Sequence, residues 1–229
     1  MNLATVTPLR IPLPNGNSIS GLLRQPNEAK AVYVFAHGAG AGMNHVFMAD
    51  LSGALAKRGI ATMRFQFPYM EAGGKRPDTP AVAHVAIRSA VREAAQRLPD
   101  VPLFAGGKSF GGRMTSQAEA IETLPHVRGL VFVGFPLHPT GKPGTDRGEH
   151  LVDVKVPMLF LQGTRDALAE LELMRRTVDR LGQRATLHVV DGADHAFHVL
   201  ARSGRRDSDV IEELADTMAS WMSDVQSRS

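Results

Sequence analysis

A serine, an acid and a histidine stand in this sequence in an order that suits nucleophilic catalysis. Ser109 is the centre of a complete G-x-S-x-G motif, GKSFG (107–111). A serine in this motif lies on a tight strand-to-helix turn, which needs small neighbours on either side. Asp166 and His195 follow in the order that the motif requires. The pattern predicts Ser109 as nucleophile, His195 as general base and Asp166 as the orienting acid. The alternative is that the segment is a glycine-rich turn whose serine has no catalytic role.

Other residues stay open for the roles of acid and base. His198 could be the base, but we favour His195 because it follows the preceding strand more closely. Asp191 and Asp194 are weaker candidates for the acid, since they share a tight loop with the histidine that they would orient. Asp166 itself could simply cap the helix that follows it.

Backbone N–H groups near the serine are candidates for an oxyanion hole. HGAG (37–40) follows an expected strand, so its amides, that of Ala39 in particular, can face the nucleophile. The N–H of Phe110, the residue after the nucleophile, gives a second donor. Gly40 is a candidate substrate contact, and His37 is expected to shape the turn.

Two glycine-rich segments resemble nucleotide-binding motifs without completing them. GGKS (106–109) lacks the earlier glycine of a Walker loop, because Pro102 stands at that position. The glycines within 38–42 lack the third glycine of a dinucleotide fingerprint, which would fall at Met43. Arg64 stands near the place of the ribose-binding acid. We therefore predict no nucleotide cofactor.

The residues that could do chemistry follow short apolar segments, which predict a mostly parallel, doubly wound α/β sheet flanked by helices. An antiparallel edge strand is expected at 18–25. The expected buried strands span 31–36, 60–65, 101–105, 129–133, 156–162 and 185–190. Expected helices start at Pro80, near Phe110, at Leu171 and before Val210. We expect one domain, 1–229.

Composition excludes several classes of function. The 229 residues include no cysteine, which rules out disulfides, zinc thiolates and a cysteine nucleophile. The net charge is +3, basic residues run no longer than pairs, and 6% of residues are aromatic, so we expect no nucleic-acid partner. Neither a signal peptide nor a membrane span is recognisable, so we expect a cytoplasmic protein without membrane contact. No metal or cofactor is expected, the oligomeric state is left open, and the expected partner is a small acyl substrate.

Six motifs are spread over nearly the whole chain: HGAGAGMNH (37–45), GGKSFGGR (106–113), FPLHPTGKPG (135–144), EHL (149–151), LQGTRDAL (161–168) and GADH (192–195). In this order they resemble the α/β-hydrolases, and among these a small dienelactone-hydrolase-like branch. That branch is grouped with hydrolase-like domains of a testis-expressed protein and of a nonspecific-lethal complex subunit. The resemblance implies the α/β-hydrolase fold and the triad of Ser109, Asp166 and His195. True dienelactone hydrolases use cysteine where this chain has serine, so their substrate is not carried over.

The segment 134–150 stands where many α/β-hydrolases insert a helical lid. It holds three prolines and four glycines, so we expect a loop, a minimal fold without a lid and an open, shallow pocket. His138 in this segment is a candidate substrate contact. Five basic residues could favour an acidic or polar substrate: Lys108, Arg113, Arg165, His138 and His150. The commoner explanation is that such charges are solvated and that such histidines stabilise turns.

Together these features predict a serine hydrolase for a small ester, lactone or thioester. One alternative is a non-catalytic protein of the same fold that binds partners, which an intact triad disfavours. Another is an acyltransferase or a peptidase that uses the same serine.

Overall fold

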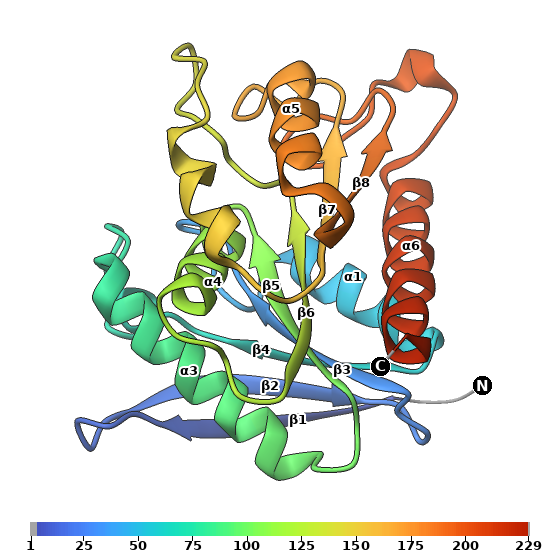
Figure 1. Cartoon of the computed structure of the whole chain (residues 1–229). Helices are drawn as coiled ribbons and strands as arrows, with labels where there is room; N and C mark the ends of the chain where they lie inside the picture. Colours follow the sequence, from blue (N-terminus) through green and yellow to red (C-terminus); the bar gives the residue numbers. More distant parts are fainter. Residues whose placement is uncertain (1–3, 229) are drawn as a thin grey trace.

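The computed structural model describes residues 4–228, whose eight strands form one sheet (Figure 1). Their order in the sheet is β1-β2-β4-β3-β5-β6-β7-β8. β1 pairs antiparallel with β2, β2 pairs antiparallel with β4, and all other pairs are parallel. The strands span Thr5–Pro12, Ser18–Gln25, Ala31–Ala36, Ile60–Phe65, Leu103–Lys108, Val127–Val133, Met158–Gly163 and Ala185–Val190, in chain order from β1 to β8. The expected mostly parallel sheet is confirmed.

The edge of the sheet differs from the expectation. The strand at 18–25 is present as β2, but β1 pairs outside it and forms the edge. In β1 only Leu9 and Ile11 are buried. Pro8 and Pro12 have no N–H to give to a ladder, which an edge strand tolerates. A largely exposed strand with two prolines lacks the apolar signal that marks the other strands.

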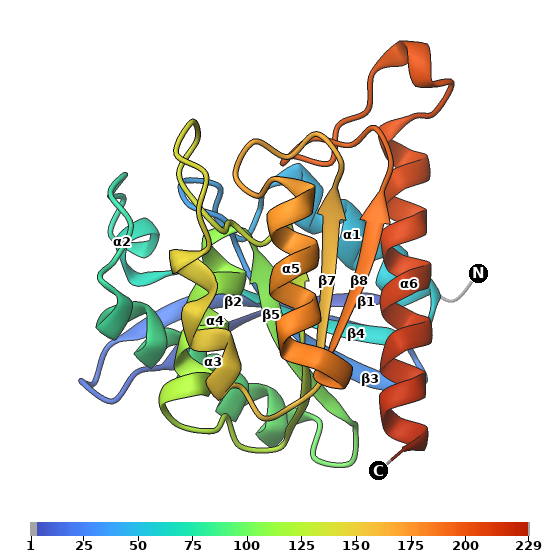
Figure 2. The ribbon, with the colours of Figure 1, turned by 45° about the horizontal axis from the view of Figure 1, so that its top comes forward.

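Helices cover both faces of the sheet, because its central strands are apolar on both sides. Every residue of β3, β4 and β7 is buried. One face packs against α3 (Pro80–Arg97), α4 (Phe110–Ile121) and α5 (Leu171–Leu181). The other packs against α1 (Val46–Lys57) and α6 (Asp207–Ser227). Figure 2 shows α5 and α6 flanking β7 and β8.

Local signals account for several helix boundaries. Pro80 occupies the first turn of α3, α4 begins at Phe110 as expected, and Gly182 with φ +63° ends α5. Two helices, α1 and the short α2 (Pro68–Glu71), were not among those expected from the sequence. Within residues 4–228, no helix combines the length and the apolar character needed to cross a membrane.

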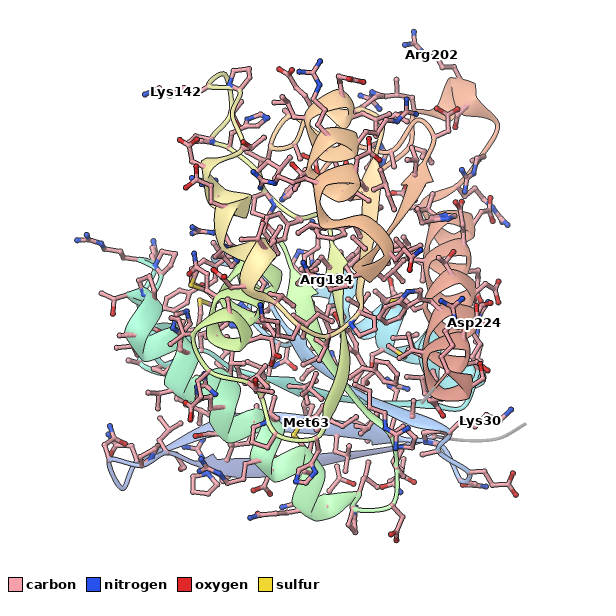
Figure 3. All side chains as sticks on the ribbon, in the orientation of Figure 1. Lys30, Met63, Lys142, Arg184, Arg202 and Asp224 are labelled. Atoms are coloured by element: carbon pink, nitrogen blue, oxygen red, sulfur yellow. The ribbon has the colours of Figure 1, made fainter. Side chains whose placement is uncertain are left out.

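The carboxyl ends of β5 to β8 point to the same edge of the sheet (Figure 1), and the segment between β6 and β7 begins there. This segment is irregular up to Thr145 and then forms a 3₁₀ helix, η1 (Asp146–Asp153). Leu137 and Leu151 anchor it in the core. Lys142 extends from its outer tip, away from the sheet (Figure 3). The segment contains no α-helix, so the expected absence of a helical lid is confirmed.

Candidate active site

Ser109 lies between β5 and α4 in a backbone conformation that few residues other than glycine adopt. Its φ is +50° and its ψ is −115°. Such strain persists only where the surrounding structure holds the residue. A Cβ atom at Gly107 or at Gly111 would lie 2.5 Å from the carbonyl oxygen of Ala36. Both positions therefore require glycine, because this turn packs directly against the end of β3.

Ser109, His195 and Asp166 form a continuous row of hydrogen bonds. Nε2 of His195 lies 2.8 Å from Oγ of Ser109, and Nδ1 of His195 lies 2.7 Å from Oδ2 of Asp166. The three residues follow the carboxyl ends of β5, β8 and β7. The Asp166 side chain is 0% exposed and the imidazole 26% exposed. The row therefore runs from a buried carboxylate to a histidine and serine that a ligand can reach.

Two further donors hold the carboxylate of Asp166. The N–H of Leu168 donates to Oδ1 at 2.8 Å, and Nε2 of Gln162 donates to Oδ2 at 2.5 Å. Gln162 is fully buried at the end of β7, and its Oε1 has no hydrogen-bond partner in the described structure. Gln162 was not among the candidate residues, although a polar residue at the end of an apolar strand is a usable signal. Glu170, not Asp166, occupies the N-cap position of α5, so Asp166 does not serve as its cap.

The alternative acid and base candidates have other partners. Nδ1 of His198 lies 2.8 Å from Oδ2 of Asp207, whose carboxylate raises the pKa of His198. Asp194 accepts two backbone N–H groups of its own loop. Asp191 lies 3.4 Å from a threonine hydroxyl in the loop after β7. These side chains therefore hold the loop that carries His195 rather than its imidazole.

The N–H groups proposed for the oxyanion hole are available at the site. Phe110 is the first residue of α4, where an N–H has no acceptor within the helix. The N–H of Ala39 donates to no residue in the range 4–228. A Cβ atom at Gly38 would lie 3.8 Å from the Cβ of Ser109, so this loop approaches the serine. The N–H of Gly40, by contrast, donates to the hydroxyl of Tyr69 at 2.8 Å, which leaves no free donor there for substrate.

His37 is buried, and both of its ring nitrogens are engaged. Nδ1 donates to the carbonyl of Gly38 at 2.7 Å, and the N–H of Phe67 donates to Nε2 at 3.1 Å. These bonds select the neutral imidazole, and burial lowers the pKa of His37 in the same sense. The ring packs edge-on against Phe67, with centroids 4.8 Å apart. His37 thus shapes the turn after β3.

His138 has a structural position instead of the expected contact with substrate. The residue is buried, its Nδ1 donates to the carbonyl of Pro139 at 2.9 Å, and the N–H of Glu170 donates to its Nε2 at 3.3 Å. Its own N–H donates to the carbonyl of Leu168. His138 therefore joins the segment 134–150 to the loop after β7. The sequence could not reveal this role, because the direction of the ring depends on a contact 32 residues away.

The remaining basic candidates differ in their surroundings. Nε2 of His150 lies 2.7 Å from Oγ of Ser116, and burial beside Arg113 lowers the pKa of His150 to about 4. His150 is therefore uncharged near neutral pH. Arg165 donates to the carbonyl of Gly192 at 3.1 Å. Arg113 is half-buried, and its Nε has no partner among the described residues.

Comparisons with known proteins agree with this architecture. A dienelactone hydrolase from Anabaena variabilis superposes with a TM-score of 0.75 and 18% identity, covering 96% of this chain and 97% of that one. A serine hydrolase without a lid from Xanthomonas campestris gives a TM-score of 0.74 and 20% identity, covering 94% of each chain. These similarities show the fold.

A sequence relative and a family match complete the comparison. A Mycobacterium tuberculosis protein provisionally named phosphoribosyl transferase is 25% identical over 213 residues, which are 90% of this chain and 44% of that protein. The chain thus spans less than half the length of the curated relatives that it matches. Residues 29–223 match the family described as the alpha/beta hydrolase domain, and this range includes Ser109, Asp166 and His195. The chain therefore belongs to the α/β-hydrolase domain family.

Proposed function

We propose that this chain is a serine hydrolase that cleaves a small ester, lactone or thioester through an acyl-enzyme on Ser109. One observation carries the proposal: His195 lies within hydrogen-bond distance of both the Ser109 hydroxyl, at 2.8 Å, and the buried Asp166 carboxylate, at 2.7 Å. An imidazole held in this way can accept a proton at Nε2, while its Nδ1–H donates to the carboxylate. The φ of +50° at the serine is the second support, because it presents Oγ at the end of the sheet.

In the acylation step, Oγ of Ser109 attacks the carbonyl carbon of the substrate, and its proton passes to Nε2 of His195. The carbonyl oxygen becomes negatively charged and accepts hydrogen bonds from the N–H groups of Ala39 and Phe110. One such donor contributes about 3–4 kcal/mol to the stability of the transition state. The bond from carbon to the leaving oxygen or sulfur then breaks, and His195 returns the proton to the leaving alcohol or thiol.

Deacylation repeats these steps with water. His195 takes a proton from the water molecule, whose oxygen attacks the acyl carbon. The bond to Oγ of Ser109 breaks, the serine recovers its proton from His195, and the carboxylic acid leaves. Asp166 keeps its negative charge throughout and stabilises the imidazolium at each stage.

The segment between β6 and β7 bears on the size of the substrate. Without a helical lid, the site offers little enclosed apolar surface for a long acyl chain, and long-chain substrates gain affinity from such surface. We therefore favour short acyl groups.

An acyltransferase or peptidase would use the same serine. The transferase name belongs to a protein of which this chain covers 44%, so it is not carried over.

The proposal is tested by hydrolysis of p-nitrophenyl acetate, butyrate, octanoate and palmitate. Wild type is expected to favour the two shorter esters, and Ser109→Ala is expected to lose at least about a thousandfold in kcat. Ser116→Ala is a matched control, because Ser116 also lies beside a histidine but is buried. Activity that survives in Ser109→Ala would contradict the assignment of the nucleophile. A strong preference for palmitate would contradict the short-chain expectation.

A further inference from the structure

Lys108, the residue directly before Ser109, contacts the loop that carries His195. Its Nζ donates a hydrogen bond to the backbone carbonyl of His195 at 2.5 Å. The ammonium lies 5.4 Å from the ring centroid of Phe197 and 6.0 Å from that of Phe47. These two rings stack with centroids 5.8 Å apart. A cation at such distances is attracted to the rings, so the half-buried side chain of Lys108 is held against them.

Gly134, the residue directly after β6, lies close to both Lys108 and His195. A Cβ atom at Gly134 would lie 3.0 Å from Nζ of Lys108 and 3.5 Å from both Nδ1 and Cε1 of His195. The backbone at Gly134 has a φ of +69°, which also favours glycine. The lysine ammonium and the imidazole therefore lie against the same small residue.

The charged groups around Lys108 come from the two loops that carry the acid and the base. Asp166 in the loop after β7 and Asp194 in the loop after β8 attract the ammonium. His195 is the third titratable neighbour. The two uncharged neighbours are Phe47 from α1 and Gly134 directly after β6. Burial outweighs the two carboxylates and lowers the pKa of Lys108 to about 8. A buried lysine charge costs stability, so a compensating role in function is the physical expectation.

We infer that Lys108 is a positioning residue for His195: it holds the backbone of the histidine so that the imidazole reaches Asp166 and Ser109 together. The inference rests on the proposed hydrolase function. Nδ1 and Nε2 must meet partners on two different loops, and a shift of about 1 Å in such a geometry can reduce a rate about a hundredfold. The charge-assisted bond from Lys108, at the end of β5 and directly before Ser109, to the His195 carbonyl restrains that shift.

The test replaces the ammonium without removing the bulk of the side chain. Lys108→Met is expected to lower kcat for p-nitrophenyl acetate by about 10- to 100-fold with little change in KM, because the ammonium is directed at the His195 carbonyl and this ester carries no charge. Its melting temperature is expected to fall by no more than about 4 °C, since the lost hydrogen bond and the relieved buried charge oppose each other. Lys155→Met, which changes an exposed lysine before β7, is the matched control.

A rescue experiment separates the ammonium from the shape of the side chain. The chain has no cysteine, so Lys108→Cys carries a single thiol. Aminoethylation of the unfolded variant followed by refolding restores an ammonium of nearly the same reach. It is expected to recover at least about half of the kcat that Lys108→Cys loses. Wild-type protein that is unfolded, treated and refolded in the same way is the control for losses during refolding.

A proton NMR signature tests the inference even without a measurable reaction. The Nδ1–H of His195, bonded to Asp166, is expected as a sharp downfield resonance in wild type and as a broadened or missing one in Lys108→Met. An unchanged resonance together with a wild-type kcat in Lys108→Met would overturn the role of Lys108. A sharp wild-type resonance that broadens in the variant, with no ester cleaved by wild type, would instead overturn the proposed function alone. A fall in melting temperature of more than about 10 °C would mean that Lys108 acts on folding, which also overturns the inference.

Discussion

The side-chain amide of Gln162 donates a hydrogen bond to Oδ2 of Asp166, the same carboxylate oxygen that faces His195. Gln162 is the penultimate residue of β7, so the sheet itself orients the carboxylate. Hydrogen bonds to charged groups contribute about 1.5–3 kcal/mol. A residue of the strand β7 thus helps to hold the carboxylate of Asp166 in the direction of His195.

Gln162→Met is expected to lower kcat about tenfold, because it removes this donor while nearly keeping the volume of the side chain. The loss stays moderate since Leu168 still donates to Oδ1 of Asp166. Gln162→Glu is expected to be worse, because it places a second carboxylate beside the first. Ester kinetics and thermal melts check both variants. A Gln162→Met enzyme as fast as wild type would show that the strand does not orient the acid.

Asp166→Asn is expected to reduce kcat by about 10³- to 10⁴-fold, because an amide no longer selects the tautomer of His195 with Nδ1–H facing it. Asp207→Asn is the matched control: it breaks the pair with His198, 2.8 Å away, and is expected to keep nearly all activity. Measuring kcat of both variants with the same ester and buffer shows which carboxylate supports catalysis. If Asp207→Asn were the slower of the two, His198 would be the base.

The role inferred for Lys108 predicts that activity falls at alkaline pH. The pKa of Lys108 is lowered to about 8 by burial, so the charged bond to His195 weakens above that pH. We expect kcat to decline above about pH 8 in wild type, and to show no such decline in Lys108→Met.

Stability should change in the opposite direction. The pKa of Lys108 is lower in the folded chain than the value of about 10.4 in an unfolded one. The unfolded chain therefore binds more protons between about pH 8 and 10.4, and the contribution of Lys108 to stability rises over this range. Thermal melts of wild type and Lys108→Met from pH 7 to 10 measure the difference. A wild type that loses stability relative to the variant across this range would contradict the lowered pKa.

Gly107→Ala is expected to destabilise the fold strongly, by about 3 kcal/mol or more, because the new Cβ meets a backbone oxygen at 2.5 Å. Gly53→Ala is the matched control inside α1, where a Cβ would meet no atom of residues 4–228 within 4 Å. It is expected to stabilise the protein by about 0.5–1 kcal/mol through helix propensity. Denaturant unfolding compares the two. Similar effects of both substitutions would refute the tight packing of the turn against β3.

Much of the sheet was predictable because buried strands have a simple local signature. The strands at 31–36, 60–65 and 185–190 have the predicted bounds. The strand expected at 101–105 instead spans Leu103–Lys108. Glycines 106 and 107 indicated a turn, but they continue the strand, because the backbone of the neighbouring strands lies too close for a side chain there. The exposed β1 had no such signature. Local sequence therefore reveals an apolar strand better than its ends or its neighbours.

The candidate site was predictable only where a motif or the order of residues marks it. Ser109, Asp166 and His195 are brought together as the motif order suggested. The bond of Lys108 to the His195 carbonyl joins residues 87 positions apart and involves a backbone atom, which leaves no mark on the sequence. In the same way, the orientation of the His138 ring depends on its contact with the N–H of Glu170, which is distant in the sequence.

The most direct test of the central claim is covalent labelling with a fluorophosphonate probe, followed by peptide mapping of the adduct. Phosphonylation requires a serine that its histidine activates, and it does not depend on knowing the substrate. We predict one adduct per chain, on Ser109, absent from Ser109→Ala and retained in Ser116→Ala. Folded wild-type protein that remains unlabelled, or is labelled at a different serine, would contradict the account.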